Sequence, residues 1–142
     1  MKFFGSKKYV ADNPGSTSGG NDHLWGGDGN DQIQGYLGDD QLMGGIGDDT
    51  LVGGDGRDWL QGGMGNDRLQ GGADADTILD LGGSNWLSGG DANDYLSSGS
   101  SMGTHTLLEG DAGDDTLHGG DSDNTFVGRS EAGRTIEIQT GF

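Results

Sequence analysis

The chain has 142 residues, of which 33 are Gly, one is Pro and none is Cys. Only 29% of the residues are hydrophobic, which excludes a conventional core packed between long helices, and the chain lacks the Gly at every third position that collagen requires. The net charge of −17 argues against nucleic acid as a partner, because binding phosphate needs clustered positive charge, and no apolar stretch is long enough for a membrane span.

The acidic residues are unusual in kind. Of the 24, three are Glu and the other 21 are Asp. A solvated acidic surface has little reason to avoid Glu, whereas a short carboxylate held close to a turn suits coordination of a hard cation. Without Cys, disulfides, thiolate metal sites and a Cys nucleophile do not enter the argument.

Residues 1–16 lie outside any repeat. They contain all three Lys of the chain together with Phe3, Phe4, Tyr9 and Val10, and they lack the apolar run of an N-terminal secretion signal. We interpret this segment as a cap or an interaction segment.

From residue 17 to residue 127 the sequence repeats every nine residues. Nine units run without a break over residues 17–97, and three more begin at residues 100, 110 and 119, after slips at 98–99 and 109. Gly dominates the first, second and fourth places of the unit, as expected for a turn that needs positive φ or close backbone contact.

Two other places hold one kind of side chain. The eighth place is always apolar and is predicted to form the core: Leu24, Ile33, Leu42, Leu51, Leu60, Leu69, Ile78, Leu87, Leu96, Leu107, Leu117 and Phe126. The sixth place is polar and mostly Asp: Asp22, Asp31, Asp40, Asp49, Asp58, Asp67, Asp76, Asn85, Asp94, His105, Asp115 and Asn124. Each unit is therefore predicted to be a six-residue turn followed by a three-residue strand with one inward side chain.

One inward side chain in nine residues cannot close a core alone, but two units per coil place two short parallel sheets face to face. Six coils at ~4.8 Å spacing give a rod about 29 Å long. The turns then stack along two edges, where carboxylates repel each other unless a cation lies between successive turns. The predicted fold is an all-β, right-handed parallel β-roll, a β-solenoid.

The unit resembles the Gly-Gly-x-Gly-x-Asp-x-U-x nonapeptide of the RTX family of calcium-binding parallel β-roll proteins, and the resemblance covers residues 17–127. It implies one Ca²⁺ between turns two units apart, bound by the sixth-place Asp of both turns. Main-chain carbonyls would come from the second and fourth places of one turn and from the first and third places of the next. The family also implies type I secretion of an unfolded chain that folds in extracellular Ca²⁺.

Alternate units share an edge. The first edge carries Asp22, Asp40, Asp58, Asp76, Asp94 and Asp115, and the second carries Asp31, Asp49 and Asp67, then Asn85, His105 and Asn124. We predict five Ca²⁺ sites on the first edge and two on the second, with Asp67 and Asn85 as a marginal eighth. The implied main-chain ligands are Ser18, Gly20, Gly27, Gly29, Gly35, Tyr36, Leu37, Gly38, Gly44, Gly45, Ile46, Gly47, Gly53, Gly54, Asp55, Gly56, Gly62, Met64, Gly71, Gly72, Ala73 and Gly89.

Other sequence patterns are weaker evidence for a function. Residues 99–103 match the G-x-S-x-G hydrolase elbow, but that elbow needs the strand-to-helix turn of an α/β sheet, so we expect no enzyme. Trp59, Trp86 and Tyr95 fall in outward-facing places. They are candidates for contact with a glycan or a neighbouring rod, or they are scattered surface aromatics.

Residues 128–142 contain an alternating stretch, 135–139, that predicts a strand. We interpret the segment as a strand or cap, and the resemblance implies a type I secretion signal there. Together with residues 1–16 it either caps the ends of its own roll or contacts another copy. A contact between unlike ends of two copies can propagate into a filament.

Two functions fit these features. We favour a secreted, stand-alone structural protein of the extracellular space or cell surface that binds calcium and self-assembles as a matrix, surface-layer or filament subunit. The alternative is the C-terminal folding and secretion module of a larger RTX enzyme, toxin or adhesin. The first is favoured because 142 residues leave no room for a catalytic domain beside the repeats.

Overall fold

The computed structural model describes residues 2–3, 8–10, 19–99, 104–120, 123–128 and 137–140, and the side chains of 19–99, 104–120 and 123–128. These residues form the strands β1 (Lys2–Phe3), β2 (Lys8–Val10), β3 (His23–Asp28), β4 (Gln32–Leu37), β5 (Gln41–Ile46), β6 (Thr50–Asp55), β7 (Trp59–Met64), β8 (Arg68–Ala73), β9 (Thr77–Asp80), β10 (Trp86–Asp91), β11 (Tyr95–Ser98), β12 (Leu107–Ala112), β13 (Thr116–Gly119), β14 (Thr125–Val127) and β15 (Glu137–Thr140). No helix in the described part of the chain could span a membrane.

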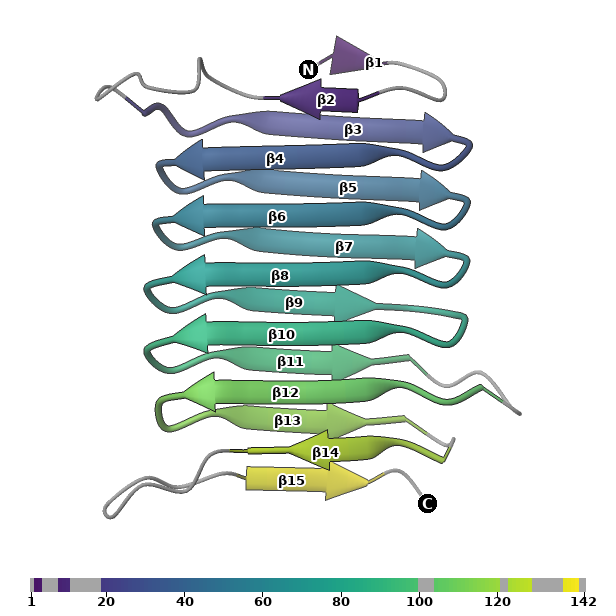
Figure 1. The fold of residues 1–142 in the computed structure, drawn as a ribbon, viewed down its shortest axis with the longest axis vertical. Coiled ribbons are helices and arrows are strands. Elements are labelled where there is room, and N and C mark those ends of the chain that lie inside the picture. Colours follow the sequence, from purple (N-terminus) through teal and green to yellow (C-terminus); the bar gives the residue numbers. More distant parts are fainter. Residues whose placement is uncertain are drawn as a thin grey trace.

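The strands form two sheets in which every pair is parallel. The odd-numbered strands make one sheet in the order β1-β3-β5-β7-β9-β11-β13-β15, and the even-numbered strands make the other, from β14 to β2. The chain therefore alternates between the sheets and advances by one strand position with every coil (Figure 1). This confirms the predicted all-β solenoid of parallel sheets with about six coils.

The strands are longer than predicted. Eight of the described strands have six residues, such as β6 (Thr50–Asp55), because each continues from the seventh place through the Gly-Gly of the next unit. The register shows why, since Gly54 pairs with Tyr36 on one side and with Gly72 on the other. The prediction of three-residue strands was wrong because the first three places of the unit also join the ladder.

The core is a single file of eighth-place side chains between the sheets. Ten of them are buried, each with at most 2% of its surface exposed: Ile33, Leu42, Leu51, Leu60, Leu69, Ile78, Leu87, Leu96, Leu108 and Leu117. Leu24 and Phe126 pack against this cluster and are partly buried. Burying a side chain of this size stabilises the fold by about 1.5–3 kcal/mol.

One predicted core residue was wrong. Leu108, not Leu107, occupies the eighth place, and Leu107 pairs with Trp86 in the outward-facing seventh place. The sixth place of the same unit is accordingly Thr106, which is buried, and His105 is exposed. The two predicted slips are therefore one three-residue insertion between β11 and β12, and the predicted slip at Glu109 does not occur.

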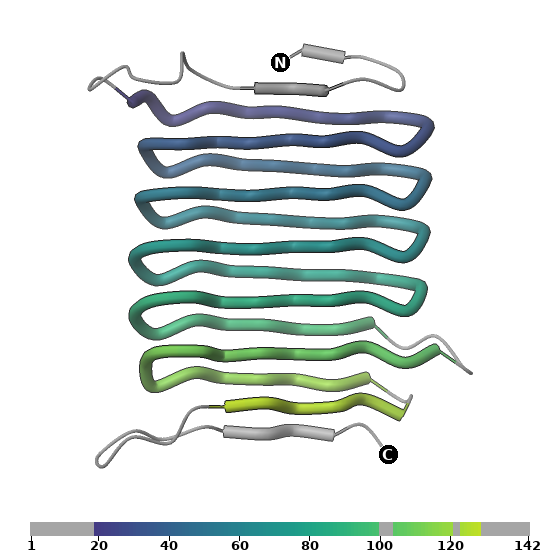
Figure 2. Tube along the Cα trace, in the orientation of Figure 1, coloured from purple at the N-terminus to yellow at the C-terminus, as the bar shows by residue number. Residues whose placement is uncertain are grey.

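The insertion affects one edge only. Partners in successive coils are 18 residues apart through most of the roll and 21 apart across the insertion. The turn between β11 and β12 lies at the second edge, whereas the first-edge contact between Asp94 and Asp115 is kept. Both edges appear as stacked turns along the trace (Figure 2).

The end strands extend the same two sheets. β1 pairs with β3, β2 pairs with β4, and β15 pairs with β13, each in parallel. β15 overlaps the stretch over 135–139 that predicts a strand.

Four described residues other than Gly have positive φ, and all lie in first-edge turns. They are Tyr36 and Asp111 in the second place and Asp74 and Ala92 in the fourth, with φ of 80°, 63°, 72° and 80°. A left-handed conformation costs an L-residue about 1–2 kcal/mol. Asp74 and Ala92 replace the usual fourth-place Gly and keep the turn conformation at this cost.

Replacing Ala92 by Gly should therefore stabilise the roll. We expect Ala92→Gly to raise the free energy of unfolding by about 0.5–1 kcal/mol, because relief of the left-handed strain exceeds the added entropy of the unfolded chain. Urea denaturation in saturating CaCl₂ measures the change. The matched control is Ala112→Gly, a strand position without positive φ, which should lower stability. A loss of stability in both variants would contradict the strain at Ala92.

Candidate metal centre

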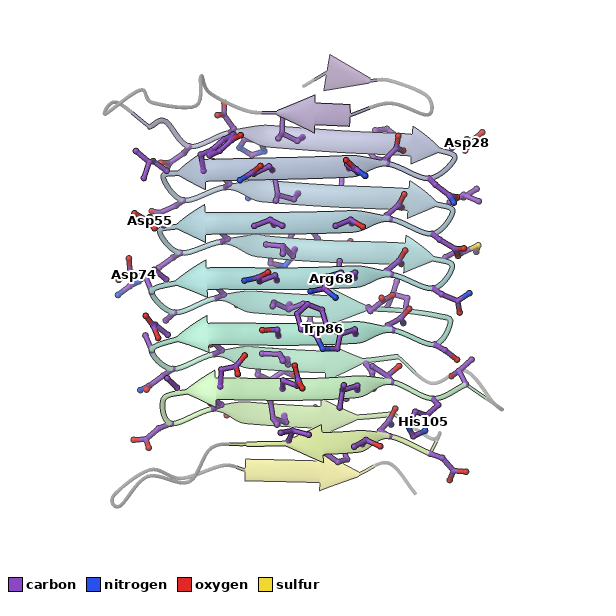
Figure 3. The ribbon with its side chains drawn as sticks, viewed as in Figure 1. Asp28, Asp55, Arg68, Asp74, Trp86 and His105 are labelled. Carbon is purple, nitrogen blue, oxygen red and sulfur yellow. The ribbon has the colours of Figure 1, made fainter. Side chains whose placement is uncertain are left out.

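The sixth-place side chains form a stack along each edge of the roll. In Figure 3, Asp55 and Asp74 mark the first edge, and Asp28 and His105 mark the second. The sixth-place Asp side chains from Asp31 to Asp115 are at most 3% exposed, and Asp22 at the first coil is half-buried. Buried carboxylates therefore succeed one another at the spacing of the coils.

One oxygen of each carboxylate holds the preceding coil. Asp76 Oδ1 accepts the backbone N–H of Asp58 at 2.8 Å, and Asp58 Oδ1 accepts the N–H of Asp40 at the same distance. The same bond recurs on the second edge, from the N–H of Asp49 to Asp67 Oδ1. This contact aims each carboxylate back into the gap between two turns.

The fifth place carries a second ladder that the sequence analysis missed. Its side-chain oxygens bond in the opposite sense, toward the next coil: Asn30 Oδ1 accepts the N–H of Asp48 at 3.0 Å, and Asp48 Oδ1 accepts that of Asn66 at 2.8 Å. The signal was present as Asn and Asp in the fifth column. These bonds are exposed, so they order the turn without adding buried charge.

In five of the sixth-place carboxylates the other oxygen is left without a hydrogen-bond donor. Oδ2 is buried and unpartnered in a set that spans both edges: Asp49, Asp58, Asp67, Asp76 and Asp94. Burial of an ionised carboxylate without compensation is costly. A cation in the gap would remove that cost.

The pKa values of these carboxyl groups reflect the same cost. Burial, with further repulsion from Asp58 and Asp94, raises the pKa of Asp76 from 3.8 to about 8. Burial likewise raises the pKa of Asp94 to about 7, and those of Asp49 and Asp58 to about 6. Without a cation, these groups therefore hold protons at a pH where an ordinary Asp is ionised.

Main-chain carbonyls enter the same gaps from both turns. A Cβ added at Gly54 would collide with the carbonyl oxygen of Tyr36, and one at Gly56 with that of Gly38, so the second- and fourth-place carbonyls face the next coil. The third-place carbonyl of the later turn points back toward the earlier turn, because the Asp55 carbonyl accepts the N–H of Gly38 at 2.9 Å. The close packing explains why these places hold Gly.

The first-place Gly lies beside both a sixth-place carboxylate and a main-chain carbonyl of the next coil. A Cβ at Gly35 would collide with Asp40 Oδ2 and would lie 2.8 Å from the carbonyl oxygen of Gly53, one coil later. The predicted main-chain ligands thus lie in facing segments of successive coils, except Ser18, which lies outside the described residues. Their role as ligands stays a prediction.

This donor set fits a hard divalent cation. In the described residues no three His, Cys, Asp or Glu side chains gather, so a cation between two turns would draw on two carboxylates and complete its shell with carbonyls. Six or more oxygen ligands at ~2.3–2.6 Å, from carboxylates and backbone carbonyls, are typical of Ca²⁺. The unpartnered Oδ2 atoms supply the charge that such an ion requires.

The second edge changes character after Asp67. Asn85 Oδ1 accepts the N–H of Asp67 at 2.8 Å, and Thr106 Oγ1 accepts that of Asn85 at 3.4 Å. His105, predicted in this stack, instead belongs to the fifth-place ladder, where its N–H donates to Ser84 Oγ at 3.1 Å. Neutral groups thus continue the stack without the charge.

The nonapeptide repeat of this chain matches a known protein family. The RTX calcium-binding nonapeptide repeat matches the chain in four copies, over residues 16–51, 43–78, 70–101 and 105–132. The chain belongs to this family. No curated protein and no solved structure matches it.

The RTX repeats are calcium-binding repeats, and the matched residues span both edges of the roll. The resemblance seen in the sequence is therefore confirmed. Where two facing turns both carry a sixth-place Asp, they present carboxylates and carbonyls to each other, and a bound Ca²⁺ would supply the positive charge between them.

The predicted aromatic surface is partly engaged within the RTX roll. Arg68 lies over the Trp86 ring at 3.8 Å from its centroid, and Trp86 Nε1 donates to Glu109 Oε2 at 2.8 Å (Figure 3). Tyr95 is 40% exposed. A glycan or neighbouring rod at Trp59, Trp86 or Tyr95 stays a prediction, and most of the 99–103 segment lies outside the described residues.

The raised pKa values predict how pH acts on the metal-free roll. An Asp whose folded pKa exceeds its unfolded value binds a proton more tightly when folded, so its stabilising contribution is present below pH 4 and is lost as pH rises through about 6 to 8. In calcium-free buffer, we expect a smaller folded fraction at about pH 8 than at about pH 5, because these carboxyl groups are ionised at the higher pH. Circular dichroism as a function of pH measures the folded fraction.

Calcium is the control for this pH effect. CaCl₂ should restore stability at about pH 8, where the carboxylates are free to bind it. A metal-free chain that is more stable at about pH 8 than at about pH 5 would contradict the assignment of the buried carboxylates as the destabilising groups.

Proposed function

We propose that this protein is a secreted structural protein that folds in extracellular Ca²⁺ and self-assembles into a matrix, surface layer or filament. The proposal rests above all on the buried, unpartnered Oδ2 atoms repeated along the two edges. They make the roll costly to form without cations and favourable to form with them.

The charge supports folding outside the cell. Seven Ca²⁺, five from first-edge Asp pairs and two from second-edge pairs, would carry +14 against the chain's net charge of −17. Extracellular calcium modules commonly bind with dissociation constants of ~10⁻⁴–10⁻³ M. At those affinities the chain would stay unfolded at low calcium and fold on secretion.

The ends of the two sheets support self-assembly. Among the described strands, β1, β2, β14 and β15 end the sheets, and each pairs with a neighbouring strand on one side only. Unpaired strand edges are templates for pairing with another chain. Because the two ends of the roll differ, their contact would be head-to-tail and would extend into a filament and not close.

Sedimentation velocity in EGTA and then in millimolar CaCl₂, at matched protein concentration and with MgCl₂ as the control, tests the proposal. We expect an expanded monomer in EGTA and large, open-ended species in calcium that EGTA dissolves. A compact monomer of 14.6 kDa in calcium would reject self-assembly and favour the module of a larger RTX protein. No response to calcium would reject calcium-dependent folding itself.

The two edges should contribute unequally. Asp58 belongs to two predicted sites and contacts Asp40 and Asp76, whereas Asn124 carries no charge. Asp58→Ala should raise the calcium concentration at the folding midpoint roughly tenfold or more, and Asn124→Ala far less. Calcium titration followed by circular dichroism measures both midpoints, and equal shifts would contradict the predicted inequality of the edges.

A further inference from the structure

Asp80 occupies a place that is Gly in most units. It is the first residue of its unit, and its partner one coil later in the same sheet is Ser98, the other first-place residue with a side chain among the described units. The remaining first places are Gly26, Gly35, Gly44, Gly53, Gly62, Gly71, Gly89, Gly110 and Gly119. The Asp80 side chain is buried, with 1% of its surface exposed. Its Oδ1 accepts the N–H of Leu81 at 2.6 Å, whereas its Oδ2 is buried without a donor.

The turn has room for this side chain because its sixth place is not Asp. Elsewhere the first-place Gly lies against the sixth-place carboxylate of its own turn, and a Cβ at Gly53 or Gly71 would collide with Asp58 or Asp76. In this turn the sixth place is Asn85, whose Nδ2 donates to the Gly82 carbonyl at 3.1 Å. The carboxylate missing at position 85 is therefore present at position 80.

The Asp80 carboxylate faces the preceding coil. A Cβ added at Gly62 would lie 2.5 Å from Asp67 Oδ2 and 2.7 Å from Asp80 Oδ2, so the two unpartnered oxygens converge on the same point. In the preceding second-edge turn, the corresponding point beside Gly44 is shared by Asp49 Oδ2 and the Gly62 carbonyl. At Gly62 the nearest oxygen from the next coil is instead a carboxylate oxygen, Asp80 Oδ2.

Two buried carboxylates that face each other need a positive charge between them. Asp80 is 1% exposed and Asp67 is 3% exposed, so water screens little of the repulsion between their Oδ2 atoms. Arg68, the cation next in sequence to Asp67, has its guanidinium over the Trp86 ring. A bound cation or a shared proton would balance the pair.

We propose that Asp80 and Asp67 are the carboxylate ligands of a further Ca²⁺ site on the second edge, between the turns over 62–67 and 80–85. Asp80 supplies, from the first place, the charge that Asn85 lacks in the sixth. This inference rests on the proposed calcium-dependent folding. It makes the Asp67 site a full site in place of a marginal one, and it extends the second edge's cations by one coil.

Counting bound calcium in the whole chain tests the site. Wild type, Asp80→Asn and the control Asp123→Asn would be dialysed against millimolar CaCl₂, and calcium per chain measured by elemental analysis. Asp123 is exposed in a turn whose sixth place is Asn124, so its variant changes the net charge equally without touching the pair or a predicted site. We expect one ion fewer in Asp80→Asn and no loss in Asp123→Asn. An unchanged count in Asp80→Asn would overturn the proposal and assign a shared proton to the pair.

A swap variant keeps the test decisive if Asp80→Asn folds poorly. Asp80→Gly combined with Asn85→Asp returns the carboxylate to the sixth place and should restore both the wild-type ion count and folding by circular dichroism. If the swap fails to recover the lost ion, the carboxylate at 80 has another role and the proposal is wrong. A wild-type chain that binds no calcium would reject the proposed function itself, a result separate from any difference between variants.

Discussion

Buried carboxylates at the spacing of the coils are the constraint on which the rest of the structure depends. The hydrophobic core is one side chain wide, so the two sheets gain far less apolar burial per residue than a layered domain does. At the edges, the turns bury carboxylates such as Asp58 and Asp76 one above the other. Whatever neutralises these groups decides whether the coils stack, and a divalent cation shared by two turns neutralises them while linking coil to coil.

Hydrogen bonds between successive turns position the carboxylates in this arrangement. Sixth-place carboxylates such as Asp76 hold the N–H of the preceding coil, whereas fifth-place oxygens such as Asn30 Oδ1 hold that of the next. The two ladders run in opposite senses through neighbouring residues of one turn. Each such turn is therefore held from both sides, and the Oδ2 atoms of carboxylates such as Asp58 and Asp76 have no donor and face the gap between turns.

Much of this could be predicted because a fixed period translates directly into position. Every ninth residue returns to the same place, so the inward column, the two edges and the parallel pairing follow from the repeat. The errors arose where the period breaks. Leu107 and Leu108 are both apolar, and nothing local says which points inward; only pairing with Leu87, one coil earlier, decides it. Asp80 was missed for a related reason, since its role depends on Asn85 and on Asp67 in another coil.

Strained backbone conformations and departures from the sixth-place Asp occur at different edges of the roll. The described residues with positive φ other than Gly, such as Asp74 and Ala92, all lie at the first edge, where the carboxylate stack is complete. The second edge keeps Gly at its positive-φ positions, takes the insertion, and replaces Asp by Asn85 and Thr106. A cation that ties two turns together would offset backbone strain of about 1–2 kcal/mol, which accounts for strained turns at the edge where the predicted sites are most continuous. Where the charged stack ends, the backbone must be stable by itself, and relaxed glycine turns with neutral side chains meet that need.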